Sequence, residues 1–209
     1  SILSLHGRSD DHNTTGENQT YKLNFTQFLG KFKLAVTHST GLRNPTLYEL
    51  YGTDNSGIGG NINLDPEKSR TNELFVKYNL SDDLSFSSTA YRTTIFDRIE
   101  SNAAYSRHEN QSIDLNQEGL ENELFYKGNS QILSFFTNFS KSKKITGGAQ
   151  SRRPDLNYGS NYVKKISSSP IGTFNLNLNY KHTGKHIDYD GGNIRVKSTD
   201  IMNLSLTKK

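Results

Sequence analysis

Two loop segments of the sequence carry residues that can bind ions. Arg152 and Arg153 stand directly before Pro154, and two adjacent guanidinium groups can hold a phosphate or carboxylate, because each presents several donors in a planar fork. The alternative is that both arginines are solvated loop charges. Asp188-Tyr189-Asp190-Gly191 is similar to the start of a calcium-binding loop. However, Thr199 occupies the position that should hold a bidentate Glu, so we expect no dedicated calcium site there.

Motifs for catalysis or metal binding are weak throughout the chain. His182 and His186 are four residues apart, but on a strand that runs into a loop this spacing does not set a zinc geometry as it would on a helix. Gly57-Ile58-Gly59-Gly60 follows no strand of a βαβ unit, so it is a poor phosphate loop. The sequence has no Cys and no nucleophile–base motif. We therefore expect no enzyme, metal or cofactor; a barrel phospholipase is the least favoured alternative.

The composition favours a β-rich chain that lacks a large conventional core. The 209 residues are 32% hydrophobic, and the mean hydropathy is -0.75. Eleven Tyr and eleven Phe are too many aromatic residues for a disordered tail. The net charge of +4 is too mild to indicate a nucleic-acid partner. No apolar run approaches the roughly 18 residues of a membrane helix. An all-β chain whose strands each have one apolar face fits these values.

Alternation of apolar and polar residues marks the strands. The clearest case is 173–181, where Phe, Leu, Leu and Tyr alternate with Thr, Asn and Lys, since only a strand turns successive side chains to opposite faces. About ten such strands are expected. We predict that the apolar set faces lipid and the polar set faces a lumen. The apolar set is Leu74, Val76, Tyr78, Phe174, Leu176 and Leu178, and the polar set is Glu73, Lys77, Asn175 and Asn177.

The connections between these strands alternate in length. Short ones are expected at 29–30, 81–83, 128–129 and 167–170, and long ones at 10–18, 40–69, 97–111, 142–154 and 183–198. In an up-and-down meander this sorting puts all short turns at one end, which is the layout of an outer-membrane β-barrel with long extracellular loops. The alternative is a soluble β-sandwich that acts as a binding module or adhesin. Within the 40–69 loop, Pro45 at a first helical position predicts one or two helical turns.

Two stretches resemble TonB-dependent outer-membrane receptors. The first runs from Gly41-Leu42-Arg43-Asn44-Pro45 through Glu49-Leu50 to Gly60-Asn61 and Leu64-Asp65-Pro66-Glu67. The second combines Asp97-Arg98-Ile99 with Asn116 and Gly119-Leu120-Glu121. A third, shorter stretch, Gly7-Arg8-Ser9-Asp10 with Arg152-Arg153-Pro154, is most similar to the cobalamin receptor branch.

The resemblance implies one domain over 1–209: roughly strands 11 to 20 of a 22-stranded antiparallel transmembrane barrel, without the plug domain. It also implies outer-membrane localisation and active uptake of cobalamin or a similar large ligand, with a siderophore or heme receptor as the alternative. The expected partners are that ligand, the TonB energy-transducing complex acting through a plug, and outer-membrane lipid or lipopolysaccharide. Arg152 and Tyr189 are the expected ligand-binding residues. Arg43 and Glu67 are expected to position an ordered 44–67 loop rather than to bind ligand.

Overall fold

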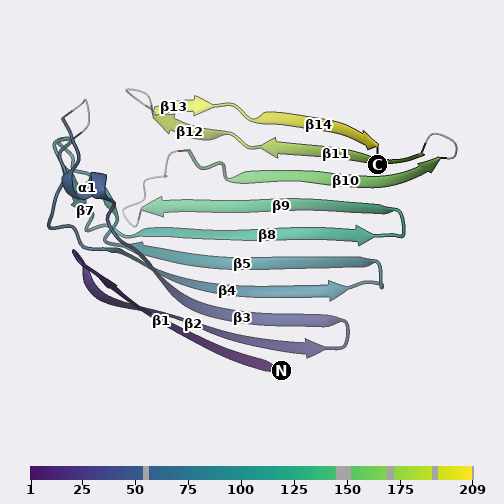
Figure 1. The fold of residues 1–209 in the computed structure, drawn as a ribbon, viewed down its shortest axis with the longest axis horizontal. Helices are drawn as coiled ribbons and strands as arrows, with labels where there is room; N and C mark the ends of the chain where they lie inside the picture. Colours follow the sequence, from purple (N-terminus) through teal and green to yellow (C-terminus); the bar gives the residue numbers. More distant parts are fainter. Residues whose placement is uncertain (54–56, 145–151, 169–171, 190–192, 209) are drawn as a thin grey trace.

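The computed structural model describes residues 1–53, 57–144, 152–168, 172–189 and 193–208 (Figure 1). At Lys144, Ser168, Tyr189 and Asn193 only the backbone is described.

Ten antiparallel strands form one continuous sheet in which most neighbours are also consecutive in the sequence (Figure 1). The strands are β1 (Ile2–His12), β2 (Gly16–Leu29), β3 (Phe32–Arg43), β4 (Glu67–Asn79), β5 (Leu84–Phe96), β8 (Leu115–Lys127), β9 (Gln131–Lys144), β10 (Leu156–Ser168), β11 (Gly172–Thr183) and β14 (Thr199–Lys208). The all-β prediction and the expected number of long strands are confirmed. A single sheet, rather than two packed sheets, also rules out the sandwich alternative for the residues described.

The connections lie at two ends, as predicted. The tight turns between β2 and β3, β4 and β5, and β8 and β9 lie at one end of the sheet, and the long loops lie at the other (Figure 1). The expected loops at 40–69 and 142–154 begin or end within strands, because β3 continues to Arg43, β4 begins at Glu67 and β9 continues to Lys144. The difference is largest at the first long loop. The expected long loop at 10–18 is a strand pair that continues to His12 and Gly16. Apolar residues stop alternating near Tyr21, at the loop side of β2. The β1–β2 pairing nevertheless continues toward the loop, where Asp11 pairs with Glu17 and His12 pairs with Gly16.

The long loops contain secondary structure of their own. The hairpin β6 (Ile99–Ser101) with β7 (His108–Asn110) follows β5, and the hairpin β12 (His186–Tyr189) with β13 (Asn193–Val196) follows β11. Neither hairpin was predicted. The predicted helical turns form α1 (Leu47–Tyr51), but its N-cap is Thr46, so Pro45 precedes the cap instead of opening the helix. No helix within the described part of the chain is long and apolar enough to cross a membrane.

The strand register places the predicted apolar and polar sets on opposite faces. Leu74 pairs with Ala90, and Leu178 pairs with Tyr162, whereas Glu73 pairs with Tyr91. Along β4 the face with Leu74 is the more exposed one, and Leu74 itself keeps 49% of its surface. The apolar residues therefore form a broad face that nothing in the described chain covers, as a lipid-facing surface requires. We call the two sides the apolar face and the polar face.

Hydrogen bonds satisfy polar side chains on both faces. On the polar face, Asn179 donates to Asn161, and Asn161 donates to Ser134 Oγ at 3.2 Å. Polar residues also occur on the apolar face: Ser88 Oγ donates to Asn122 Oδ1 at 2.8 Å and Asn122 Nδ2 donates to Thr137 Oγ1 at 3.1 Å. Such internal pairing lets polar groups face lipid at low cost.

Candidate ligand-binding site at the loop end

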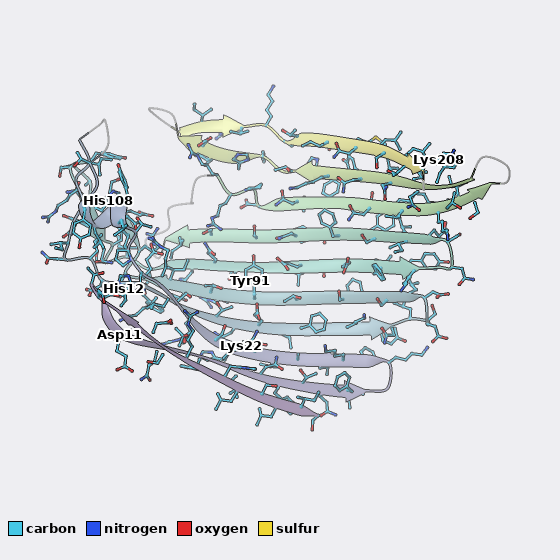
Figure 2. All side chains as sticks on the ribbon, in the orientation of Figure 1. Asp11, His12, Lys22, Tyr91, His108 and Lys208 are labelled. Carbon is cyan, nitrogen blue, oxygen red and sulfur yellow. The ribbon has the colours of Figure 1, made fainter. Side chains whose placement is uncertain are left out.

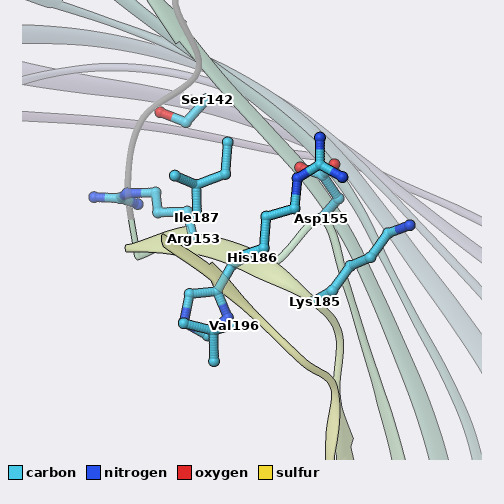
Figure 3. A pocket seen from close by; sticks show the side chains of 8 residues that line it. Ser142, Arg153, Asp155, Lys185, His186, Ile187 and Val196 are labelled. Carbon is cyan, nitrogen blue, oxygen red and sulfur yellow. The ribbon is translucent and has the colours of Figure 1, made fainter. Parts of the chain in front are cut away.

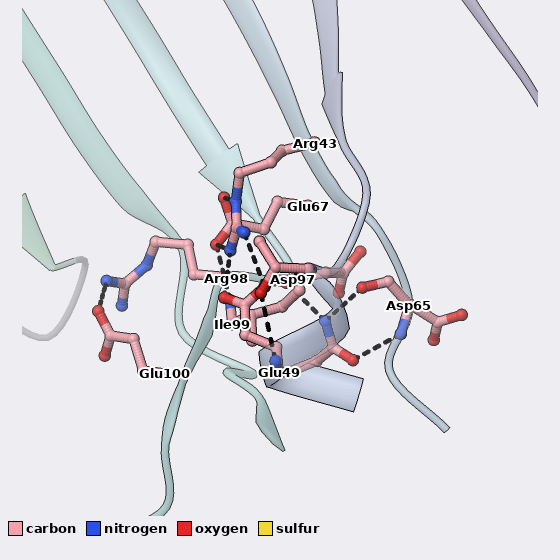
Figure 4. Close-up of polar contacts among 10 residues, drawn as sticks. Arg43, Glu49, Asp65, Glu67, Asp97, Arg98, Ile99 and Glu100 are labelled. Carbon is pink, nitrogen blue, oxygen red and sulfur yellow. Dashed lines mark hydrogen bonds and ion pairs between the residues drawn. The ribbon is translucent and has the colours of Figure 1, made fainter. Parts of the chain in front are cut away.

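An ion-pair network closes the base of the loop between β3 and β4. Arg43 Nε lies 2.8 Å from Glu67 Oε2, and its Nη2 lies 2.7 Å from Glu67 Oε1 (Figure 4). The same guanidinium donates from Nη1 to Glu49 Oε2 at 2.9 Å. Arg43 ends β3 and Glu67 begins β4, and the two residues pair across the sheet. One arginine thus ties the two ends of the loop to helix α1, in agreement with the predicted positioning role.

Helix α1 is fixed to this network by its first turn. Thr46 Oγ1 accepts from the Glu49 N–H at 3.2 Å, and the Thr46 N–H donates to Glu49 Oε2 at 2.7 Å. This reciprocal pattern is a capping box, which satisfies donors that a helix start leaves open. Beneath it, Leu50, Leu64 and Ile99 form a small buried apolar cluster. A five-residue helix is too short to be stable alone, so this packing and the ion pairs hold it.

A second set of contacts joins this loop to the loop between β5 and β8. The Asn110 amide donates to the carbonyl oxygens of Asp65 at 2.9 Å and Asp97 at 2.7 Å, and it accepts from the Asp65 N–H at 2.8 Å. The Ile99 N–H also donates to Glu67 Oε1 at 2.8 Å. Asp97 adopts a φ of 52°, a conformation that non-glycine residues seldom use. The two loops therefore form one ordered body, in which His108 lies (Figure 2).

The ion-pair network also lowers the pKa of Glu49, the carboxylate on helix α1. Partial burial of Glu49 would by itself raise its pKa, but hydrogen bonds from Arg43 and Thr46 favour the ionised form, and the net pKa shift is downward. Glu49 is therefore ionised at neutral pH.

Arg152 is held to the β12–β13 hairpin. Its N–H donates to the Ile187 carbonyl at 2.6 Å, and its Nε lies 2.5 Å from Asp188 Oδ1. Hydrogen bonding to Asp188 raises the pKa of Arg152 further. Its φ is 62°, and the side chain is 72% exposed. The predicted ligand residue is thus an exposed cation with one carboxylate partner. Tyr189, the other predicted ligand residue, ends β12, and its side chain lies outside the described residues.

A pocket of about 340 Å³ opens beside Arg152, between the loop ends of β9 and β10 and the β12–β13 hairpin (Figure 3). Three cations and one histidine line it against one carboxylate. The lining residues are Ser142, Arg153, Asp155, Lys185, His186, Ile187, Arg195 and Val196. Arg153, but not Arg152, is among them. The pocket has an excess of positive charge and two apolar side chains, so it suits an anionic group attached to an apolar body.

Of the two histidines singled out in the sequence, His186 lines this pocket and His182 does not. His182 Nδ1 lies 2.8 Å from Asp200 Oδ1, and its ring stacks on Tyr158 at a centroid distance of 4.5 Å, whereas His186 lines the pocket. Asp188 pairs with Arg152, while Asp190 and Gly191 lie outside the described residues. Within the ranges that are described, no group of three metal-ligating side chains occurs.

Sequence reasoning missed two of the three pocket cations, Lys185 and Arg195. Lys185 directly precedes β12 and Arg195 lies within β13, and both of these strands are only four residues long. The register that pairs Ile187 with Arg195 cannot be predicted from so short a pattern. The only sequence signal was the adjacent arginine pair at 152–153.

An open antiparallel sheet with one apolar and one polar face, tight turns at one end and ordered loops at the other is the wall of an outer-membrane β-barrel. The chain belongs to the TonB dependent receptor-like β-barrel family, because the sequence model of that family matches residues 2–209. Members of this family are transport receptors of the outer membrane.

Solved structures support this fold. The siderophore receptor PirA from Acinetobacter baumannii is 20% identical, with a TM-score of 0.78 over 99% of this chain and 36% of that receptor. The ferripyoverdine receptor of Pseudomonas aeruginosa is 14% identical, with a TM-score of 0.73 over 97% and 29%. The ferric yersiniabactin receptor FyuA from Yersinia pestis is 18% identical, with a TM-score of 0.70 over 91% and 29%. The chain thus spans about a third of such receptors. No curated protein matches its sequence.

Proposed function

We propose that the chain is the ligand-facing wall of a receptor that takes up a large, negatively charged metal chelate of siderophore type. The observation that carries this proposal is the pocket beside the β12–β13 hairpin, with Arg153, Lys185 and Arg195 against Asp155. Charged hydrogen bonds to carboxylates or phenolate oxygens are among the stronger polar contacts. A pocket of this volume takes one arm of a large chelate rather than the whole molecule.

The proposed mechanism has a capture step and a transport step. Ordered loops bind the ligand at the extracellular end, where the body built on Arg43 and Glu67 keeps the loop surface preorganised, so that less ordering entropy is lost on binding. The transport step uses the plug and the TonB energy-transducing complex of the whole receptor. No bond of the ligand is broken by residues of this chain in the proposal.

Cobalamin is the competing ligand, and Arg152 is the residue that favours it. The guanidinium is 72% exposed beside the pocket, and the arginine has several donors for amide carbonyls or a phosphodiester. Its contact with Asp188 offsets much of its charge, and a largely uncharged ligand makes little use of three further cations. We therefore place the acidic chelate ahead of cobalamin.

Ligand binding by the intact receptor tests the proposal. The probes are a negatively charged ferric tris-catecholate, an uncharged ferric tris-hydroxamate and cobalamin. We expect the catecholate to bind best, and the Arg153→Gln/Lys185→Gln/Arg195→Gln variant to lose about 10- to 100-fold in affinity, since each charged hydrogen bond contributes about 1.5–3 kcal/mol and part of that is screened by solvent.

A matched control neutralises three cations at the turn end of the sheet. Lys31→Gln/Lys33→Gln/Lys127→Gln removes the same charge far from the pocket, and its affinity should equal that of the wild type. Preferential binding of cobalamin that survives the pocket variant would replace the chelate with cobalamin as the ligand.

A further inference from the structure

The strands that end at the pocket carry a surface of side-chain amides on their polar face. Asn138 pairs with Glu121 and Asn161 pairs with Asn179, and side chains of directly paired residues lie on the same face. We call the asparagines of β9, β10, β11 and β14 the amide strip, and all of them share the polar face: Asn138, Asn157, Asn161, Asn175, Asn177, Asn179 and Asn203. The strip runs from the loop end, where Ser142 lines the pocket, toward the turn end of the sheet (Figure 1).

The amide strip carries no negative charge on its strands. In the described parts of β9, β10, β11 and β14, no Asp or Glu lies on the polar face, and the charged residues there are Lys165 and Lys181. By contrast, Glu73, Glu121 and Glu123 lie on the polar face of β4 and β8. An anionic ligand in the lumen therefore meets carboxylates on β4 and β8, which repel it, but none on the strip below the pocket.

A hollow of about 310 Å³ lies in the middle of the amide strip. Two neighbouring rows of the polar face border it, namely Asn161, Asn179 and Asn203 on one side and Val163, Asn177 and Ser205 on the other. The backbone of Tyr162, Leu178 and Leu204 forms the floor between these rows, because the side chains of these three residues point to the apolar face. Amides therefore border the hollow on both sides.

The amides of the hollow have hydrogen-bonding capacity for a passing ligand. Asn161 Oδ1 accepts from Asn179, and Asn161 Nδ2 donates to Ser134 Oγ at 3.2 Å. Asn177 Nδ2 donates to Ser205 Oγ at 3.2 Å. An asparagine amide has two N–H donors and an oxygen with two lone pairs, and these bonds use one donor of each amide. The hollow can therefore donate hydrogen bonds to an anionic oxygen without a full positive charge.

We propose that the hollow is a transit site, which holds one arm of the anionic chelate after the chelate leaves the cationic pocket and before it continues toward the turn end of the barrel. The proposal rests on the proposed function, because the passing ligand is the chelate captured by Arg153, Lys185 and Arg195. Passage through a lumen requires binding that is favourable enough for entry and weak enough for exit. Neutral amides meet this condition better than further cations, whose hydrogen bonds to anions are stronger.

Two carboxylates placed in the hollow test this proposal. Asn161→Asp/Asn203→Asp exchanges two amides for negatively charged groups of nearly the same shape, and the oxygen at position 161 can still accept from Asn179. We expect the uptake rate of ferric tris-catecholate by cells with the intact receptor to fall about tenfold, because the charges repel the chelate. The affinity of the purified receptor for the same chelate should equal that of the wild type. The neutral variant Asn161→Ser/Asn203→Ser should keep most of the uptake rate.

The matched control places the same charges at the same level of the lumen on another strand. Ser85 lies in the row that crosses the sheet to Asn161 and Asn203. Ser85→Asp/Ser87→Asp therefore adds two carboxylates to the polar face of β5, and its uptake rate should equal that of the wild type. Heat-modifiable migration in gels verifies that each variant is folded. The single variant Asn203→Asp, with an expected fall of about threefold, replaces the double variant if that variant does not assemble.

The affinity and the uptake rate together separate the transit site from the capture pocket. An unchanged uptake rate in the aspartate variant, or an equal fall in the Ser85 control, would overturn the transit site and leave the pocket in place. A fall in affinity as large as the fall in uptake would make the hollow a part of capture, and an equal loss in the serine variant would make it a packing surface; both would overturn the proposal. A wild-type receptor that does not bind the catecholate would overturn the proposed function and the transit site with it.

Discussion

Arg43 and Glu67 form a two-pronged ion pair that joins the last residue of β3 to the first residue of β4, with distances of 2.8 Å and 2.7 Å. The loop between these residues holds helix α1 and packs against the loop that follows β5. The ion pair therefore holds together the two ends of the loop body. Since the Glu67 carboxylate also accepts the Ile99 N–H, its effect reaches both loops.

Removing this closure should open the loops and leave the sheet intact. We expect Glu67→Gln to increase hydrogen exchange at the Ile99 amide by about tenfold, because it weakens the ion pair with Arg43 and the acceptor for that amide at once. The exposed Arg43 side chain limits the effect. Arg8→Gln, which breaks the exposed pair with Asp10, is the control. Unchanged exchange at Ile99 in the Glu67 variant would show that the closure rests on other contacts.

The pKa of Glu49 should make the loop body sensitive to acid. Its folded pKa is lowered, so the stabilisation by the ionised carboxylate is present above the ordinary glutamate pKa and is lost as the pH falls through the folded value. Carboxyl ¹³C chemical shifts of Glu49 in the intact receptor measure this midpoint. We expect it below 4.5, the ordinary value, and expect Arg43→Met to move it upward. A midpoint at or above the ordinary value would contradict the hydrogen-bond network.

Gly159 is required by close packing on the polar face. A Cβ at this position would lie 2.3 Å from the Tyr180 carbonyl oxygen and 2.8 Å from the Phe136 ring. Gly159→Ala should therefore destabilise the barrel by about 1–3 kcal/mol, seen as a lower temperature of heat-modified migration. Gly7, also in a strand, has open space around its Cβ direction, and Gly7→Ala should leave that temperature unchanged. Equal behaviour of the two variants would mean that the strands separate enough to accept a methyl group.

Comparison of Arg152 with Arg153 separates the two ligand hypotheses. Arg153 lines the pocket, while Arg152 is bound to Asp188 beside it. For an acidic chelate we expect Arg153→Ala to lower affinity by about tenfold and Arg152→Ala to have a smaller effect. For cobalamin we expect Arg152→Ala to lower the affinity more than Arg153→Ala does. Isothermal titration of the intact receptor with both ligands gives the two affinities for each variant, and an unchanged affinity in both variants would remove this pair from the site.

The fold was largely predictable from the sequence because apolar and polar residues alternate along most of the long strands, so that each of these strands has one apolar face. Leu74 and Glu73 are neighbours in β4 and lie on opposite faces, since successive side chains of a strand point to opposite sides of the sheet. Apolar and polar residue types alternate along the strand for this reason. The site was predictable only in part. Arg43 and Glu67 could be identified because a family signature surrounds them, whereas Lys185 and Arg195 reach the pocket through a short hairpin whose sequence has no distinctive period. Loop geometry depends on side-chain contacts that local patterns do not encode.

Iron uptake by living cells tests the central claim most directly. Cells whose only outer-membrane iron receptor is the intact protein are given radiolabelled ferric tris-catecholate, with and without a functional TonB complex. The account predicts uptake that requires the TonB complex and falls about tenfold or more in Arg153→Gln/Lys185→Gln/Arg195→Gln, while Lys31→Gln/Lys33→Gln/Lys127→Gln behaves as the wild type. Uptake that is independent of the TonB complex, or equal in both triple variants, would contradict it.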